Sequence, residues 1–151
     1  MNRCYGRLFL SPLLILAGCQ TTRNDGTTDA NPYQLAGTTW LLIQQGPASE
    51  AGRLADVPPY AYTMALSKDG SARFKFDCNL GTGRWKSSPA GPDGKLSFGT
   101  IAVSTKLCPA GSIGEQLSGA MHGQIAFSIY DGRLTIQTHD PDRLYVWDSV
   151  D

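Results

Sequence analysis

The chain has 151 residues, 41% of them hydrophobic, which is enough to bury one core and too few for several domains of ordinary size. Lysine and arginine together number 13, as do aspartate and glutamate, so the formal net charge is zero. Because the sequence shows no cluster of Lys and Arg that would follow a phosphate backbone, nucleic-acid binding is not expected.

Residues 1–18 have the pattern of an export signal. Arg3 and Arg7 precede an apolar run from residue 8 to residue 18, which is about half of the ~20 residues needed to cross a bilayer. The run ends in Leu16-Ala17-Gly18-Cys19, which resembles the lipobox of bacterial lipoproteins. That resemblance implies a diacylglyceryl group on Cys19 and cleavage just before it. The alternative is an ordinary secretory signal with an incidental cysteine.

Residues 19–34 contain mostly Thr, Asn, Asp, Gly and Ala, a composition that buries too little surface to fold and predicts a flexible tether. Gln20, rather than an aspartate, follows the lipobox cysteine. By the sorting rule of such lipoproteins, this implies a cell-envelope protein anchored in the outer membrane and facing the periplasm. The membrane would then be a partner through the lipid on Cys19.

The predicted folded domain covers residues 35–151. Residues 39–43 are aromatic, β-branched and aliphatic, which predicts a strand. Residues 44–59 are rich in Gly, Ala, Ser and Pro, so we expect a long irregular connection, either a binding loop or a mobile one.

Alternation predicts the next strands. Tyr62, Met64 and Leu66 share one face, and after a turn at 68–70 the apolar parity returns at Ala72, Phe74, Phe76 and Cys78. The glycines of residues 79–83 are expected to take positive φ in a second turn, followed by a strand at 83–87.

Three Asp-Gly pairs, at 69–70, 93–94 and 131–132, favour hairpins and therefore an antiparallel sheet. Ser112 and Glu115 have the spacing of a capping box and predict one short helix with an inward stripe of Ile113, Leu117, Ala120 and Met121. Ile125, Phe127 and Ile129, then Leu134 and Ile136, then Leu144 and Val146 indicate the last strands. The predicted fold is mainly β (α+β): a small antiparallel β-barrel or strongly curved sheet of about seven or eight strands with one short helix.

Cys78 and Cys108 are the cysteines that remain once the signal segment and Cys19 are set aside, and in an oxidising compartment they are a natural pair. A bridge closing a loop of about 30 residues stabilises a protein by roughly 3 to 4 kcal/mol. The alternative is a metal or redox site, but the two cysteines form no Cys-x-x-Cys motif and have no histidine at ligand spacing.

These residues together resemble the META domain of heat-shock-inducible bacterial lipoproteins, over roughly residues 35–148. The matching positions are Gly37-x-x-Trp40, Phe76-x-Cys78-Asn79-x-x-x-Gly83-x-Trp85, Leu96, Cys108-Pro109 and Glu115. Asp77, Trp85 and Lys106 depart from the residues usual in the family. The resemblance implies a small accessory lipoprotein with a role in envelope stress tolerance.

Few residues suggest catalysis. His122 and His139 are expected at the surface or at a helix end, and Asp140 with Asp142 are expected to form a turn, a weak cation site being the alternative. The sequence contains no Gly-x-Ser-x-Gly, Ser-x-x-Lys or His-Glu-x-x-His motif. We therefore expect neither an enzyme nor a cofactor or metal.

Structural roles are expected for the remaining motif residues. Asn79 is expected to hydrogen-bond the backbone of its turn and close it toward Gly83, a direct contact with a ligand being the alternative. The tryptophans, Trp40, Trp85 and Trp147, are expected in the core or at a barrel end, where an aromatic-lined mouth would be a binding site.

The leading functional hypothesis is an envelope protein that binds another envelope protein. One alternative is a barrel with a hollow interior that binds a lipid or another hydrophobic small molecule. Another is a lipoprotein that inhibits lysozyme.

Overall fold

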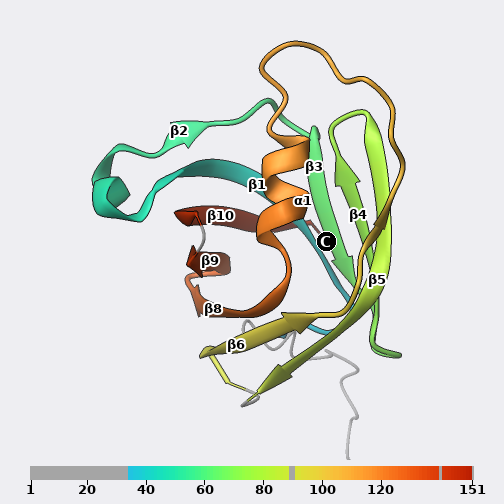
Figure 1. The fold of residues 1–151 in the computed structure, drawn as a ribbon. Helices are drawn as coiled ribbons and strands as arrows, with labels where there is room; N and C mark the ends of the chain where they lie inside the picture. The colour runs from blue at the N-terminus through green and yellow to red at the C-terminus, as the bar shows by residue number, and fades with distance from the viewer. Residues whose placement is uncertain (1–33, 89–90, 140, 151) are drawn as a thin grey trace, which may run out of the picture.

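The computed structural model describes residues 34–88, 91–139 and 141–150, and these form a closed antiparallel β-barrel with one short α-helix (Figure 1). The predictions for Cys19 and for nearly all of the tether lie outside the described residues. The strands are β1 (Thr38–Pro47), β2 (Ala55–Asp56), β3 (Tyr62–Leu66), β4 (Ser71–Phe76), β5 (Asn79–Ser88), β6 (Asp93–Phe98), β7 (Ala102–Val103), β8 (Gly123–Tyr130), β9 (Arg133–His139) and β10 (Asp142–Val150). The helices are the 3-10 helix η1 (Ala48–Arg53) and α1 (Gly114–Ala120).

Strand β1 closes the barrel because it pairs on both sides. Trp40 lies opposite Met64 of β3 on one side and opposite Ser149 of β10 on the other. The order around the barrel is β10-β9-β8-β6-β5-β4-β3-β1, while β2 pairs with β1 and β7 pairs with β5. Closure leaves no free edge in the ring of strands. The predicted fold class is therefore confirmed.

Alternate side chains fill the barrel interior. The predicted inward positions on β3, β4, β8 and β9 are all buried. The largest fully buried side chains are Trp40, Trp147, Tyr145, Phe76, Leu42, Met64, Leu66, Leu96, Leu117, Met121, Ile129 and Leu134. Each such side chain stabilises the fold by roughly 1.5 to 3 kcal/mol through burial. The interior is thus a packed core.

Helix α1 covers one end of the barrel, where it lies in front of the ring of strands in Figure 1. Its inward side chains Leu117 and Ala120, followed by Met121, are buried in the core, as the predicted stripe requires. Ile113 is partly buried against the same core. Within the described ranges, no helix has the length and hydropathy to cross a membrane.

The prediction of a long irregular connection at residues 44–59 is wrong for the first half of this segment. Strand β1 continues to Pro47, then η1 and the two-residue strand β2 follow. Gln44 and Gln45 pair with β10 on one side and with Asp56 and Ala55 of β2 on the other. The partner strands β10 and β2 are distant in the sequence, so the local composition of residues 44–47 could not predict this pairing.

The parity expected for the last strand is also wrong. Tyr145 and Trp147 are buried, whereas Leu144 and Val146 are only partly buried. Tyr145 lies opposite the buried Ile136 of β9, and this register fixes which side of β10 faces the core. Both faces of β10 carry apolar residues, so alternation alone did not discriminate between them.

Two of the three Asp-Gly pairs form the expected turns. Asp131 and Gly132 both have positive φ and connect β8 to β9 as a two-residue hairpin loop, and Gly70 has positive φ between β3 and β4. Asp93 and Gly94 instead open β6 and pair with Ser128 and Phe127 of β8. Pairing with a distant strand prevails there over the local turn signal.

Candidate functional site

A tight turn after β4 places Cys78 at the barrel end. Phe76 pairs with Asn79, so Asp77 and Cys78 are the two loop residues, and Asp77 has a φ of 59°. The turn predicted at residues 79–83 is therefore wrong, because β5 already begins at Asn79. Aspartate is one of the few residues besides glycine that tolerate positive φ, and it takes the role expected of the glycines.

The glycines of β5 instead permit close packing. A Cβ on Gly81 would lie 2.8 Å from Phe76 Cε2 and 3.2 Å from Ile101 Cγ2, and a Cβ on Gly83 would lie 3.3 Å from Ile101 Cγ1. Ile101 packs against the inner side of β5 at both glycines, and Phe76 packs there at Gly81. The absent side chains at Gly81 and Gly83 let β5 approach the segment that follows β6.

The predicted disulfide is confirmed. Cys78 and Cys108 are bonded, with their Cα atoms 5.5 Å apart. Cys108 belongs to residues 104–112, which run from β7 to the region of α1 and are called the strap below (Figure 1). The bridge therefore joins the strap to the β4–β5 turn.

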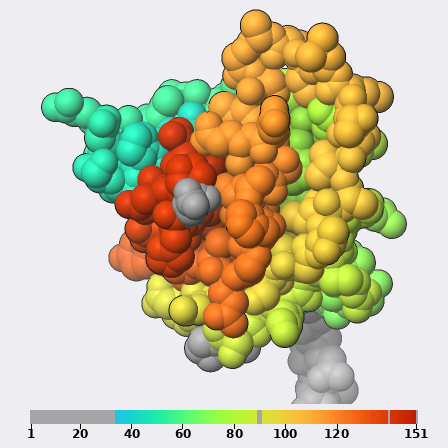
Figure 2. Space-filling model, viewed as in Figure 1, coloured from blue at the N-terminus to red at the C-terminus, as the bar shows by residue number. Residues whose placement is uncertain are grey.

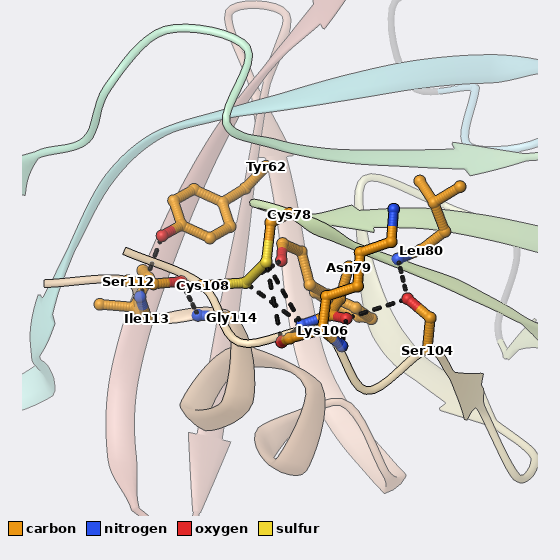
Figure 3. The surroundings of a disulfide bond; sticks show 11 residues. Tyr62, Cys78, Asn79, Leu80, Ser104, Lys106, Cys108, Ser112, Ile113 and Gly114 are labelled. Atoms are coloured by element: carbon orange, nitrogen blue, oxygen red, sulfur yellow. Dashed lines mark hydrogen bonds between the residues drawn. A yellow bond between two sulfur atoms is a disulfide. The ribbon is translucent and has the colours of Figure 1, made fainter. Parts of the chain in front are cut away.

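Asn79 fixes the strap next to the disulfide (Figure 3). Its Nδ2 donates to the Lys106 carbonyl at 3.0 Å and lies 3.2 Å from Cys108 Sγ. Its Oδ1 accepts from the Lys106 amide at 2.7 Å and from the Ser104 hydroxyl at 2.9 Å. Asn79 thus has a structural role, but it bonds the strap and not the backbone of its own turn, which corrects the sequence prediction.

Tyr62 holds the other end of the strap. Its hydroxyl accepts from the Ile113 amide at 2.9 Å (Figure 3). Helix α1 begins at Gly114, so Ile113 occupies the N-cap position and no capping side-chain bond is made there. The predicted capping box is wrong, since the Ser112 hydroxyl accepts from the Gly114 amide at 3.3 Å.

Glu115 therefore remains exposed in the first turn of α1. The helix start also lies directly against β4, because a Cβ on Gly114 would be 2.7 Å from the Phe76 carbonyl oxygen. Gly114 thus allows the helix to approach the backbone at the end of β4.

A recess of about 410 Å³ lies between the strap and α1. Figure 2 shows it as a hollow beside the arch of the strap. Phe76 and Val103 contribute apolar surface, while Lys106 and Glu115 contribute opposite charges from the two sides. Leu107, at its rim, is fully exposed. The recess can therefore receive an apolar side chain flanked by polar or charged groups.

The pKa of Asp69 is lowered, because the Ser71 hydroxyl and then the Ser71 amide donate to its carboxylate. Asp69 lies in the β3–β4 turn, away from the recess. His122 is exposed and its ring contacts the Gly119 carbonyl, while His139 is exposed at the end of β9. Within the described ranges, no three His, Cys, Asp or Glu residues gather as metal ligands.

Comparison with known proteins places this architecture in a family. The profile of the META domain matches residues 33–151. The chain belongs to the META domain family. No curated protein sequence matches it.

Solved structures share the META fold of this chain. An NMR structure of a protein from Burkholderia xenovorans has a TM-score of 0.59 at 20% identity, with 99% of both chains covered. A second NMR structure, titled only as a protein, has a TM-score of 0.56 at 17% identity and covers 78% of this chain and 92% of its own. At these identities the likeness extends to the fold alone.

The META motif residues fall into two groups. Asn79 bonds the strap and Glu115 lines the recess beside it, whereas Gly83 packs against Thr100 and Ile101 in the segment after β6. Trp40 is buried in the barrel, and Trp85 is half-buried with its indole N–H donating to the Ser67 carbonyl at 3.0 Å. The motif therefore does not form one site.

Sequence reasoning missed Tyr62 and Ser104, which bond the two ends of the strap, and Leu107 at the rim of the recess. Tyr62 was assigned only to the core, and Ser104 and Leu107 were given no role. The hydrogen bond between Ser104 and Asn79 spans 25 residues of sequence, and the one between Ile113 and Tyr62 spans 51. A local sequence pattern cannot predict contacts between residues so far apart.

Proposed function

We propose that this protein is a non-catalytic lipoprotein of the cell envelope that binds another envelope protein through the recess beside the Cys78–Cys108 disulfide. Lipidation at Cys19 would hold it at the outer membrane, with the barrel in the periplasm and residues 19–34 as the tether. Its role would be that of an accessory protein in envelope stress tolerance.

The observation that carries the proposal is the rigid, exposed rim of the recess. The disulfide, the Asn79 bonds and the Tyr62 bond fix the strap at several points, yet Leu107 projects fully into solvent. An apolar side chain that is presented beside a recess by a preorganised segment can bind a partner with little loss of conformational entropy.

The packed interior also favours binding at the surface. The hypothesis of an internal lipid or hydrophobic ligand requires space inside the barrel, and the interior positions of the described strands are occupied by large side chains such as Trp40, Tyr145 and Trp147. The disulfide supports an oxidising compartment, which agrees with export of the chain.

Photo-crosslinking in cells tests the proposal. A photoreactive amino acid at Leu107 should yield a discrete crosslinked protein, whereas the same residue at Tyr130, which is 75% exposed at the far end of β8, should not. Glu115→Lys, which reverses the charge of one recess wall, should reduce the Leu107 adduct. Equal adducts at both sites, or none at Leu107 above an unlipidated secreted form, would contradict the proposal.

A further inference from the structure

The outer face of β4, β5 and β6 carries five of the ten Lys and Arg side chains of the described residues. Because Phe74, Gly81 and Leu96 are buried and face inward, the alternate residues of these strands face outward. The outward basic residues are Arg73, Lys75, Arg84, Lys86 and Lys95, which together are called the basic face below.

Strand register brings these residues together from separate parts of the sequence. Arg73 lies opposite Thr82, two positions before Arg84, and Lys86 lies opposite Ser97, two positions after Lys95. Diagonal neighbours of this kind are about 7 to 8 Å apart. In Figure 1, β4, β5 and β6 follow one side of the barrel. Strand pairing therefore gathers on one face cations that are separated in the sequence.

Three carboxylates lie on or next to this face, Asp93 on β6 and Asp69 and Asp77 in the turns before and after β4, but none forms an ion pair with its cations among the described residues. Strands β4 and β5 contain no Asp or Glu, and the ion pair within 4 Å among the described residues joins Arg133 to Asp148, on β9 and β10. Lys75 donates to the Tyr60 carbonyl at 2.8 Å and Arg84 donates to the Asp69 carbonyl at 2.9 Å. Both acceptors are uncharged carbonyls, so these bonds orient the two cations. The Asp69 carboxylate also interacts electrostatically with Arg84 and offsets part of its charge.

Two further features flank the basic face. Leu80, which lies opposite Lys75 and faces outward, is 64% exposed, and Tyr60, held by Lys75, is 65% exposed. A hollow of about 600 Å³ lies between β5 and β6, with Arg84 and Lys86 in its lining. Cations beside exposed apolar side chains are the pattern of surfaces that lie on a bilayer, where phosphates neutralise the charge and apolar groups enter the headgroup layer.

We infer that the basic face binds the phosphate headgroups of an anionic phospholipid bilayer. The hollow beside Arg84 and Lys86 would receive a headgroup, and Leu80 and Tyr60 would insert at the edge. This inference rests on the proposed function only in placing the barrel next to a membrane, since the contact itself needs neither the lipid on Cys19 nor the recess.

Vesicle flotation tests the inference. The chain from Gln20 to Asp151, which contains the whole closed barrel and its core but no acyl group, is mixed with vesicles of phosphatidylcholine alone or with about one third phosphatidylglycerol. We expect binding only to the anionic vesicles, weakened by salt because the contact is electrostatic. The double variant Arg73→Glu/Lys86→Glu should lower the apparent affinity by about tenfold or more.

The matched control is Arg53→Glu/Arg133→Glu, which changes the net charge equally at residues away from the basic face and should leave the affinity within about threefold of the parent. Circular dichroism establishes that each variant is folded. Leu80→Ser should weaken binding while leaving its salt dependence in place.

Several results would overturn the inference. One is equal binding to neutral and anionic vesicles, and another is an equal loss in both charge-reversal variants. Binding to polyglutamate without binding to vesicles would assign the basic face to an acidic protein instead. Competition by free glycerol phosphate at micromolar concentration would assign it to a soluble phosphate ligand. None of these results bears on the Leu107 crosslink, so the proposed function is tested separately.

Discussion

Asn79 joins two segments through both ends of one amide. Its carbonyl oxygen accepts two hydrogen bonds from the strap and its amide nitrogen donates to the Lys106 carbonyl. Aspartate would retain the acceptor but lose the donor, and a longer glutamine would not fit the same distances. A short side chain with both functions is required at this position, which explains the Cys-Asn pair at the level of a single residue.

Replacement of Asn79 by alanine should destabilise the domain by about 1 to 3 kcal/mol, since three bonds of roughly 1 kcal/mol each are lost in a partly exposed setting. Urea denaturation of oxidised protein measures the change. Gln124→Ala, at an exposed position on β8, is the control and should have little effect. A loss no larger than that of the control would show that the disulfide alone holds the strap.

Asp69 offers a prediction about pH. The Ser71 hydroxyl and amide hold the pKa of Asp69 below its ordinary value, so the interaction stabilises the fold above the unfolded-state pKa and is lost as the pH falls through the lower folded-state pKa. An NMR titration should therefore show the Asp69 pKa rising toward its ordinary value in Ser71→Ala. An unchanged pKa in that variant would mean that the hydroxyl bond contributes nothing.

The conformations and contacts of single residues were the hardest features to predict from the sequence. The sequence identified Cys78, Cys108 and Asn79 as a group, and the disulfide followed from cysteine count and compartment. It did not show that Asp77 takes positive φ, because this conformation is uncommon outside glycine and two glycines stood close by. The partners of Asn79 lie 25 or more residues away in the sequence.

Strand β5 shows at the level of one element how close packing depends on missing side chains. Its inward positions include Gly81 and Gly83, against which Ile101 and the rings of β4 pack. The stacked rings of Phe74 and Phe76, with centroids 5.2 Å apart, leave no room for a larger residue on β5. The glycines therefore determine how near the segment after β6 can lie to the barrel wall.

A methyl group at Gly81 should destabilise the fold by about 1 to 3 kcal/mol, because the new Cβ would overlap Phe76 in a packed core. Gly119→Ala is the matched control: nothing lies within 4 Å of the added Cβ in α1, and alanine favours helix, so this change should stabilise by up to about 1 kcal/mol. Thermal denaturation of both variants compares them directly. Similar effects for the two would contradict the packing account.

Elements with strict alternation were predictable, and elements defined by distant partners were not. Strands β3, β4, β8 and β9 followed from their period because one face is apolar and the other polar. In β10 both faces carry apolar residues, and in the second half of β1 the two faces do not differ in hydrophobicity. The register with the neighbouring strands therefore determines which side chains of these strands face the core. The basic face belongs to the same class, since its residues converge only when the strands pair.

At the scale of the whole molecule, the barrel is closed by β1 and fastened by the disulfide. Strand β7 pairs with β5 in the barrel wall, and the strap that follows it crosses to α1 at the barrel end. The Cys78–Cys108 bond fixes the strap to the β4–β5 turn. Barrel, strap and helix therefore form one unit.

Loss of the disulfide should lower the free energy of unfolding by roughly 3 to 4 kcal/mol, the value expected from the entropy of a loop of about 30 residues. Guanidinium denaturation of the parent with and without reductant, together with Cys78→Ser/Cys108→Ser, measures it. The Leu107 crosslink should also weaken in the double variant, because the rim is no longer fixed. Unchanged stability would indicate that the strap is held without the bridge.

The central claim is that a disulfide-bonded META barrel is anchored by lipid in the cell envelope. The intact mass of the protein extracted from its native membrane fraction, measured before and after reduction, tests this claim most directly. The account predicts a chain from Cys19 to Asp151 that carries acyl groups and gains two hydrogens on reduction. A chain that retains residues 1–18, or one without acyl groups or without the bridge, would contradict it.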